Sequence, residues 1–172
     1  MRISTPILTI YILLLSNLSS ETHSSDLISE ICKKTPFYDL CMNSLNPLNP
    51  TEDIKAVAST MANLVLSNAT DTLSFIQQLI KSGPDPELQK PLANCAELYI
   101  PVVRYNLPQA IGAFTRGKFG FASYLLSDAR KQSQDCEKNF SGSNLSPLTQ
   151  RNKLISNLCD VAVAILKLLQ KG

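Results

Sequence analysis

The sequence predicts an all-α protein: an up-down-up-down four-helix bundle with an N-terminal disulfide-stapled helical hairpin. Three observations lead to this prediction. Four long segments carry apolar residues at alternating three- and four-residue spacing, the period of an amphipathic helix. No segment shows the apolar–polar alternation of a strand, and the links between the long segments are short. The length of 172 residues favours a single domain.

The first 24 residues are predicted to be a secretory signal peptide, which is not part of the fold. Arg2 provides the positive charge at its start. Residues 7–15 form an apolar stretch that is too short to span a bilayer, which requires about 20 residues. Small residues near the expected cleavage site are Ser19, Ser20 and Ser24. A buried N-terminal helix is the alternative interpretation.

Without this leader, the predicted domain spans residues 25–172, with the hairpin in 25–48 and the bundle in 49–172. Loss of Arg2 and Glu21 leaves 15 of 16 basic and 13 of 14 acidic side chains, so the net charge stays at +2. Such a small and evenly scattered charge argues against nucleic acid or a membrane surface as a partner. Secretion makes disulfides the expected state of cysteines. Those that follow the leader are Cys32, Cys41, Cys95, Cys136 and Cys159.

A short helical pair is predicted at residues 26–34 and 37–45, separated by Pro36. Cys32 and Cys41 are nine residues apart in the sequence. On one straight helix this separation is about 13 Å, which a disulfide cannot bridge. A bond between the two cysteines therefore requires the chain to reverse near Pro36. The closed loop is expected to stabilise this hairpin by about 2.7 kcal/mol in the chain-entropy model.

The first long helix is predicted to begin at Asn49-Pro50, with Asn as the N-cap and Pro in the first helical position. It is expected to end at Lys81, before Gly83. Asp85-Pro86 then repeats the same cap-and-proline signal and begins the second long helix. The first helix therefore connects to the second through a link of only a few residues.

The apolar seam of the first long helix contains two polar residues, Asn68 and Thr72. Its members are Ile54, Ala58, Met61, Val65, Asn68, Thr72, Phe75 and Leu79. The seam therefore either drifts toward Val57 and Leu64 or carries a polar layer. Asparagines in glycosylation sequons are Asn68, Asn139 and Asn144. A glycan on Asn68 would require this residue to face outward.

The second long helix is predicted over residues 86–114, and a third runs from Lys118 to Asn139 after a break at 115–118. The second is expected to bend without breaking, because its apolar face continues through its prolines. These are Pro91, Pro101 and Pro108. Cys95 and Cys136 lie on the apolar faces of the two helices. If they pair, the disulfide ties two antiparallel helices together and contributes about 4 kcal/mol in the same model.

The last helix is predicted to be capped by Ser146, with Pro147 in its first position. Its apolar positions are Ile155, Leu158, Ala162, Ile165 and Leu169, joined by Leu154, Val161 and Leu168. Cys159 lies within this seam and is predicted to be the unpaired cysteine, because a buried free thiol behaves as a small apolar residue. An intermolecular disulfide through Cys159 is the alternative.

The sequence offers little catalytic equipment. Its single histidine, His23, lies in the predicted leader, so none remains as a general base or metal ligand. No glycine-rich phosphate loop and no zinc-type cysteine spacing is present, and neither a cofactor nor a metal is predicted. Paired carboxylates are not excluded, but the acidic residues stand mostly at helix starts and on exposed faces. These features favour a secreted binding protein over an enzyme, with a cytokine-type bundle and a carrier of small apolar ligands as other classes.

Five segments provide a more specific signal: ICKKTPFYDLC, PDPELQKPLANCAELY, LLSDARKQSQDCEKNF, SPLT and NLCDVAVAILKLL. Their order and cysteine spacing resemble the plant family of pectin methylesterase and invertase inhibitors. The resemblance covers residues 26–170 and implies a four-helix bundle with an N-terminal hairpin. It also implies disulfides Cys32–Cys41 and Cys95–Cys136, with Cys159 free.

Members of the family that this sequence resembles inhibit one of two plant enzymes. Some cover the active-site cleft of a pectin methylesterase with their bundle helices. Others block an acid invertase, a glycoside hydrolase of cell wall or vacuole, whose catalytic carboxylates a lysine can pair with. The invertase inhibitors carry Pro-Lys-Phe before the third bundle helix, where this chain has Gly117-Lys118-Phe119. Lys118 and Phe119 match, but Gly117 lacks the φ that proline fixes. In the alternative interpretation, Lys118-Phe119 is an ordinary helix start with Phe119 packed inward.

The tripeptide SDA before the fourth cysteine looks closer to the esterase inhibitors or to the related pollen allergens. The resemblance therefore implies a secreted inhibitor that forms a reversible one-to-one complex with a plant pectin methylesterase in the apoplast or cell wall. Acid invertase is the alternative target, and the vacuole is the alternative location. Outward polar residues on the middle helices, for example Asn68 or Gln109, are the expected contacts with the target.

Overall fold

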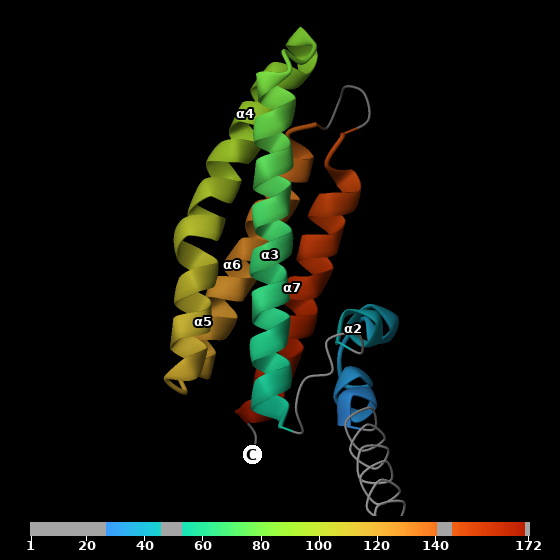
Figure 1. The fold of residues 1–172 in the computed structure, drawn as a ribbon, viewed down its shortest axis with the longest axis vertical. Helices are drawn as coiled ribbons and strands as arrows, with labels where there is room; N and C mark the ends of the chain where they lie inside the picture. Colours follow the sequence, from blue (N-terminus) through green and yellow to red (C-terminus); the bar gives the residue numbers. More distant parts are fainter. Residues whose placement is uncertain (1–26, 46–52, 141–145, 171–172) are drawn as a thin grey trace, which may run out of the picture.

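Four long helical stretches run antiparallel to one another, and a short pair of helices lies beside them (Figure 1). The computed structural model describes residues 27–45, 53–140 and 146–170. The elements of the bundle are α3 (Ile54–Lys81), α4 (Pro86–Pro101), η2 (Val102–Asn106), α5 (Leu107–Thr115), α6 (Phe119–Lys138) and α7 (Thr149–Leu169). Because α4, η2 and α5 follow one another without a gap, they form one stretch. The predicted all-α four-helix bundle is confirmed.

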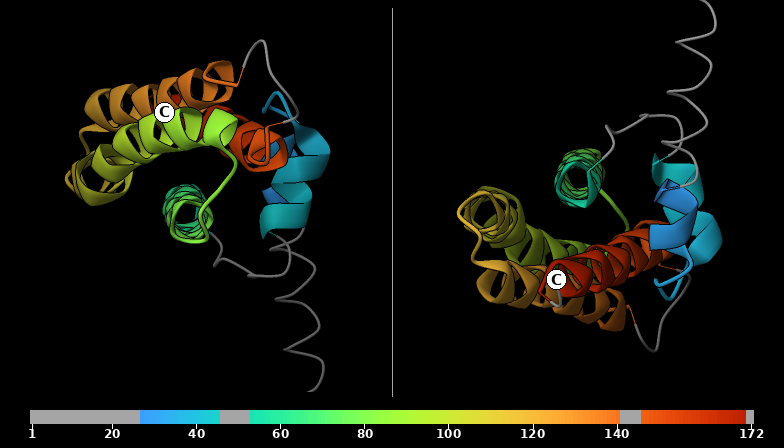
Figure 2. Two further views of the ribbon diagram at one scale, coloured as in Figure 1. Left: turned by 90° about the horizontal axis from the view of Figure 1, so that it is seen from above. Right: turned by 90° about the horizontal axis from the view of Figure 1, so that it is seen from below.

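Seen along the bundle, the four stretches surround a shared interior (Figure 2). α6 packs against α7 on one side and against α4, η2 and α5 on the other. α3 contacts α7 and the stretch from α4 to α5, which closes the ring. Each stretch therefore packs against its neighbours in the chain, as an up-down-up-down topology requires. Arg151 of α7 adds a cation–π contact to α3, with its guanidinium carbon 4.4 Å from the centroid of the Phe75 ring.

The N-terminal hairpin consists of a helix over residues 27–32 and of α2 (Tyr38–Leu45). A disulfide joins Cys32 to Cys41, whose Cα atoms are 5.5 Å apart, so the predicted stapled helix pair is confirmed. The first helix is shorter than the predicted 26–34, because the chain already turns at residues 33–36 to reach the second cysteine. α2 packs against α3 and α7. Apolar residues that the hairpin buries are Ile28, Ile31 and Leu45.

The start of α3 differs from the prediction. Asn49-Pro50 lies outside the described residues, and the helix begins only at Ile54. Asp53 is its N-cap, with a carboxylate oxygen that accepts a hydrogen bond from the backbone N–H of Lys55 at 3.1 Å. The predicted end at Lys81 is confirmed, and Gly83 follows with a positive φ of 71°. Aspartate caps a helix as well as asparagine does, so the sequence offers two possible N-caps, Asn49 and Asp53. The N-cap of α3 is Asp53.

The seam of α3 both drifts and carries a polar residue. The residues that it buries are Val57, Ala58, Met61, Ala62, Val65, Ala69, Thr72, Leu73 and Ile76. Asn68 is half-buried, and its amide donates a hydrogen bond to the carbonyl of Leu64 at 2.8 Å. Thr72 is buried, and its hydroxyl donates to the carbonyl of Asn68 at 2.8 Å. Both polar groups are thus satisfied within their own helix, which lets the polar layer sit beside the core at little cost.

The prolines of the second stretch produce a π-helical segment and no break. η2 lies between Pro101 and Pro108, and the N–H of Leu107 donates to the carbonyl of Val102, five residues earlier. A proline ring clashes with the carbonyl four residues before it and leaves that carbonyl without its usual donor. Widening the helix between two prolines relieves this conflict while the apolar face continues. The predicted bend therefore takes the form of a local change of helix type.

α7 begins later than predicted. Ser146 does not cap it directly: its hydroxyl accepts a hydrogen bond from the N–H of Leu148 at 3.1 Å, and the helix starts at Thr149. Ser146-Pro147 therefore organises a turn that precedes the helix. Leu154 was predicted to join the seam but is 37% exposed, whereas Leu166 is buried. Leu154 flanks the a/d position of Ile155, so it lies at the edge of the predicted seam, where the helix leaves it partly exposed.

A covalent and a polar link cross the interior at one level of the bundle. Cys95 of α4 and Cys136 of α6 form a disulfide, with Cα atoms 4.8 Å apart. One turn further along α4, the Tyr99 hydroxyl is buried and donates to the Oδ1 of Asn152 in α7 at 2.8 Å. The amide nitrogen of Asn152 donates in turn to Glu137 of α6 at 2.8 Å. Burial also raises the pKa of the Tyr99 phenol, so it stays a neutral donor.

The division into a leader and a mature domain stays a prediction, because residues 1–26 lie outside the described residues. In the described ranges, none of the helices has the length and apolar character needed to cross a bilayer.

We expect the thiol of Cys159 to be unreactive in the native protein. It is fully buried in α7 and unpaired, and burial raises its pKa, so thiolate is scarce at neutral pH. Labelling with a maleimide, without reductant, should modify no cysteine in the native state and one in urea. Disulfide mapping by mass spectrometry provides the control. Labelling of further cysteines in urea, or a bond from Cys159 to another cysteine, would contradict the two disulfides of the structure.

Candidate functional site

The turn between α5 and α6 contains the predicted contact residues Gly117, Lys118 and Phe119. α5 ends in a Schellman motif: the N–H of Lys118 donates to the carbonyl of Ala113 and the N–H of Gly117 to that of Phe114, both at 2.9 Å. Gly117 has a φ of 70°, the left-handed conformation that this motif requires and that glycine adopts without strain. Backbone hydrogen bonds therefore hold the turn, and the side chains of Lys118 and Arg116 are exposed.

Phe119 packs inward, as the alternative interpretation of the sequence proposed. It is half-buried, and its ring centroid lies 5.8 Å from that of Phe114 in a tilted arrangement. The two rings line a hollow of about 150 Å³, together with Lys55, Thr115 and Gly117. Lys118 is therefore an exposed charge directly before an anchored aromatic ring.

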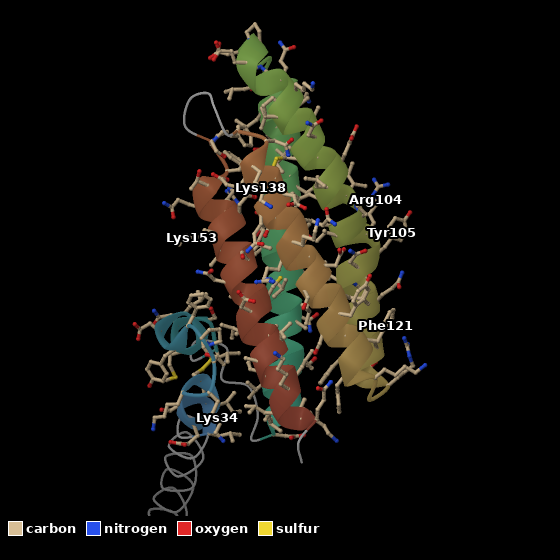
Figure 3. All side chains as sticks on the ribbon, turned by 180° about the vertical axis from the view of Figure 1, so that it is seen from behind. Lys34, Arg104, Tyr105, Phe121, Lys138 and Lys153 are labelled. Carbon is tan, nitrogen blue, oxygen red and sulfur yellow. A yellow bond between two sulfur atoms is a disulfide. The ribbon has the colours of Figure 1, made fainter. Side chains whose placement is uncertain are left out.

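A second exposed feature consists of the aromatic side chains of η2 and the first half of α6, and we call it the aromatic face: Tyr105, Phe121 and Tyr124. These side chains are 57%, 48% and 65% exposed. The rings of Phe121 and Tyr124 stack with centroids 6.4 Å apart and planes 14° apart. Tyr105 and Phe121 extend from neighbouring helices on the side of the molecule shown in Figure 3. Exposed aromatic side chains of this size are enriched at protein–protein interfaces.

The π-helical segment positions the aromatic face. Asn106, the last residue of η2, donates from its amide to a carboxylate oxygen of Asp128 in α6 at 2.5 Å. The other carboxylate oxygen of Asp128 accepts from the amide of Gln132 at 3.3 Å. Asp128 lies one turn after Tyr124 on the same side of α6, so this hydrogen bond fixes η2 next to the aromatic pair. Tyr105, adjacent to Asn106, is exposed on this fixed segment, at a different level of the bundle from Phe121 (Figure 3).

The turn was predicted from the sequence, but the aromatic face was not. Phe121 and Tyr124 are three residues apart, a spacing that places them side by side on a helix, and this signal was available. Tyr105 could not be assigned, because ordinary helical periodicity does not hold across a π-helical segment. Of the two polar contacts expected from the resemblance, Gln109 is exposed on α5. Asn68 is half-buried on α3, with its amide already engaged.

The candidate glycosylation sites differ in their surroundings. Asn139 is half-buried after the end of α6: its amide donates to the carbonyl of Asp135 at 2.9 Å, and its side-chain oxygen accepts from Asn94 at 3.0 Å. Asn68 has the engaged amide described above. Asn144 lies outside the described residues. Glycan attachment at these positions stays a prediction.

The described residues hold no group of three or more histidine, cysteine, aspartate and glutamate side chains that could bind a metal ion. Their exposed features are the aromatic face and the turn between α5 and α6, which carries Arg116 and Lys118. This arrangement is suited to recognition of a protein surface, since aromatic and arginine side chains supply most of the binding energy at such interfaces.

Three comparisons with known proteins agree on one family. The profile of the family described as plant invertase/pectin methylesterase inhibitor matches residues 26–165. The chain is 32% identical to the cell wall / vacuolar inhibitor of fructosidase 1 of Arabidopsis thaliana, covering 81% of this chain and 67% of that protein. It is 29% identical to the pectinesterase inhibitor of Actinidia deliciosa, in an alignment that covers 97% of this chain and 92% of that protein. A crystal structure of a mutant form of a pectin methylesterase inhibitor from Arabidopsis superimposes with a TM-score of 0.73, at 27% identity, over 81% of this chain and 95% of that one.

Substitution of Gly117 by alanine is expected to destabilise the protein by about 1 kcal/mol, because alanine resists the left-handed conformation. Gly120→Ala is the matched control: it lies within α6, and an added Cβ would meet only the Gln170 amide at 3.7 Å, an ordinary contact. That change should be neutral or stabilising by up to about 1 kcal/mol. Urea unfolding followed by circular dichroism measures both. Equal destabilisation by the two substitutions would contradict the described turn.

Proposed function

The chain belongs to the plant invertase/pectin methylesterase inhibitor family, and from this membership we propose that it inhibits a plant pectin methylesterase. The family consists of proteinaceous inhibitors, not of enzymes. Its relatives carry the names of both targets at about 30% identity, so the choice between them depends on features of this chain. In our proposal the protein forms a reversible one-to-one complex in which its helices cover the active-site cleft of the esterase.

The observation that favours the esterase is the backbone at Gly117. The Pro-Lys-Phe motif of the invertase inhibitors that the sequence resembles has proline at this position. Here the N–H of Gly117 donates to the carbonyl of Phe114, and the φ of Gly117 is 70°. Proline has no N–H and is restricted to a φ near −65°, so it can satisfy neither condition. The turn of this chain is therefore built differently from one that begins with proline.

The aromatic face supplies the contact surface in this proposal. Large, exposed rings lose little conformational entropy on binding, because each has few rotatable bonds. Phe121 and Tyr124 are already stacked on each other, and the hydrogen bond between Asn106 and Asp128 fixes the backbone beside them. A preorganised surface of this kind binds more tightly than a mobile one of the same area. Gln109 is exposed on α5, and Arg116 is exposed in the turn between α5 and α6. In this proposal both provide polar contacts at the rim of the interface.

A second candidate target, acid invertase, is favoured by a different observation. Lys118 is exposed directly before the anchored Phe119, so a charge extends from a fixed point on the bundle. Such a lysine can pair with the close carboxylates of a retaining glycosidase. For either target we propose secretion to the cell wall, with the vacuole as the alternative. The predicted leader and a relative named a cell wall / vacuolar inhibitor support this location.

The double substitution Phe121→Ala/Tyr124→Ala is expected to weaken inhibition of pectin methylesterase by at least about tenfold, the effect of losing one central hot-spot residue. The measurement is the inhibition constant against purified plant pectin methylesterases over pH 4–7. Tyr38→Ala on α2, where the side chain is 41% exposed, is the control that should leave inhibition unchanged. Unaltered inhibition by the double variant would exclude the aromatic face as the interface. A wild-type protein that inhibits none of several esterases would exclude the proposed target.

Lys118→Ala tests the second candidate. If the turn enters the active site of an acid invertase, loss of the ammonium group should abolish inhibition of that enzyme, because a carboxylate in the site loses its partner. Lys90→Ala is the matched control, since Lys90 is also an exposed lysine but lies on α4. Invertase assays of wild type and both variants give the result. Inhibition that is equally strong in all three proteins would rule out this mechanism.

A further inference from the structure

One end of the bundle brings together three segments that are far apart in the sequence: the start of α3, the turn between α5 and α6, and the last turn of α7 (Figure 2, right). Lys55 of α3 lines the same hollow as Gly117 and Phe119. A Cβ on Gly120 would lie 3.7 Å from the amide nitrogen of Gln170, so the end of α7 is next to the start of α6. The three segments therefore share one surface.

This surface, the basic end, carries four exposed cations: Lys55, Arg116, Lys118 and Lys167. Among the described residues of these three segments, Asp53 is the only acid, and its carboxylate caps α3. None of the four cations forms a salt bridge with a described residue. The charge of the basic end is therefore not neutralised within the described part of the molecule.

Some cations elsewhere in the described chain have carboxylate partners. Lys131 and Lys138 both pair with Asp135, at 2.6 and 2.8 Å, and Arg130 lies 3.5 Å from Asp160. The helix dipoles do not offset the charge of the basic end either, because two helices start and two helices end there. Like charges within about one Debye length of each other, about 8–10 Å, produce a positive potential that attracts an anion. The basic end is thus a place where four exposed cations without a salt bridge to a described residue meet on adjoining segments that contribute one described acid, Asp53.

We propose that the basic end binds linear polyuronate, a polysaccharide whose sugar units carry free carboxylates. This inference rests on the proposed function. A pectin methylesterase adds water across a methyl ester of such a polymer, so that methanol leaves and each ester becomes a carboxylate with release of a proton. The substrate is neutral at the esterified positions and the product is anionic. An inhibitor that binds the product is held where the esterase has already acted.

The chemistry of the basic end suits such a polymer. Lysine and arginine side chains on separate elements can each reach a different carboxylate along an extended chain. The hollow between Lys55 and the turn has Phe114 and Phe119 in its wall, and an aromatic ring offers an apolar surface to the C–H face of a sugar. Because the cations are exposed, binding is expected to be moderate in strength and sensitive to salt.

The test measures binding of the full-length secreted protein to polygalacturonate without any enzyme, by affinity electrophoresis and isothermal titration. The comparison polymer is the same polysaccharide with its carboxyls fully methylesterified. We expect binding to the free acid only, weakening by about tenfold or more as the salt concentration shortens the Debye length from about 10 Å to about 3 Å. Equal binding to both polymers, or no binding to either, would overturn the proposal.

Matched variants place the binding on the basic end. Lys55→Gln/Lys167→Gln removes two of its cations and leaves the turn residues intact. Lys81→Gln/Lys90→Gln removes the same charge from the opposite end, at the end of α3 and in α4. The first variant should bind polygalacturonate several-fold more weakly than wild type, since each exposed ion pair contributes a factor of up to about five. The second should bind as wild type does. Equal losses in both variants would show that only net charge matters and would overturn the proposed site.

A separate assay distinguishes this inference from the proposed function. Esterase inhibition is measured with a small neutral methyl ester as substrate, so that no polyuronate is present. Inhibition without binding to polygalacturonate would overturn the inference and leave the proposed function standing. Binding to polygalacturonate without inhibition of any esterase would overturn the proposed function and leave only a polysaccharide-binding surface, without the role given to it here.

Discussion

The register of the helices depends on one buried level of the bundle, where the Cys95–Cys136 disulfide lies beside the hydrogen bonds from Tyr99 to Asn152 and from Asn152 to Glu137. The disulfide fixes α4 against α6, and the polar chain adds α7. A shift of any of these helices along its axis would leave a buried hydroxyl or amide without a partner, which costs about 1–3 kcal/mol for each group. Apolar contacts alone tolerate such shifts more readily. The positions of the exposed residues therefore follow from a few interior atoms.

The surface that we assign to target recognition results from a second constraint, the prolines in the stretch that begins at α4. Pro101 and Pro108 flank a π-helical segment, and this segment brings Asn106 to Asp128 of α6 and carries the exposed Tyr105. π-helical turns are frequent at functional sites, because they redirect side chains without ending a helix. In this protein the segment carries an exposed tyrosine, which suits the proposed role of covering another protein.

Most of the fold could be predicted from the sequence, because amphipathic period and cysteine placement are strong local signals. The four helical stretches and the hairpin were predicted in this way. The errors have local causes. Asp53 caps α3 in place of Asn49, since both residue types cap well and the sequence does not rank them. Ser146-Pro147 forms a turn because its hydroxyl bonds two residues ahead, which a cap signal does not exclude.

The candidate site was less accessible to prediction. Gly117 could be identified as a departure from Pro-Lys-Phe, but its positive φ and its hydrogen bond are properties of the folded turn. The pairing of Asn106 with Asp128 joins residues from two helices, and no local pattern encodes it. The sequence therefore indicates which residues are unusual, whereas their arrangement into a surface depends on tertiary packing and on the π-helical segment.

The Schellman turn after α5 is closed entirely by main-chain atoms, and its conformation needs only a glycine at position 117. The side chains of Arg116 and Lys118, on either side of it, contribute nothing to this closure, which uses only their main-chain atoms. Mutations at these two positions are thus uncoupled from folding and can accumulate during divergence without loss of the scaffold. A change of side chain at either position would alter the charge that the turn presents to a partner and leave the end of the helix intact.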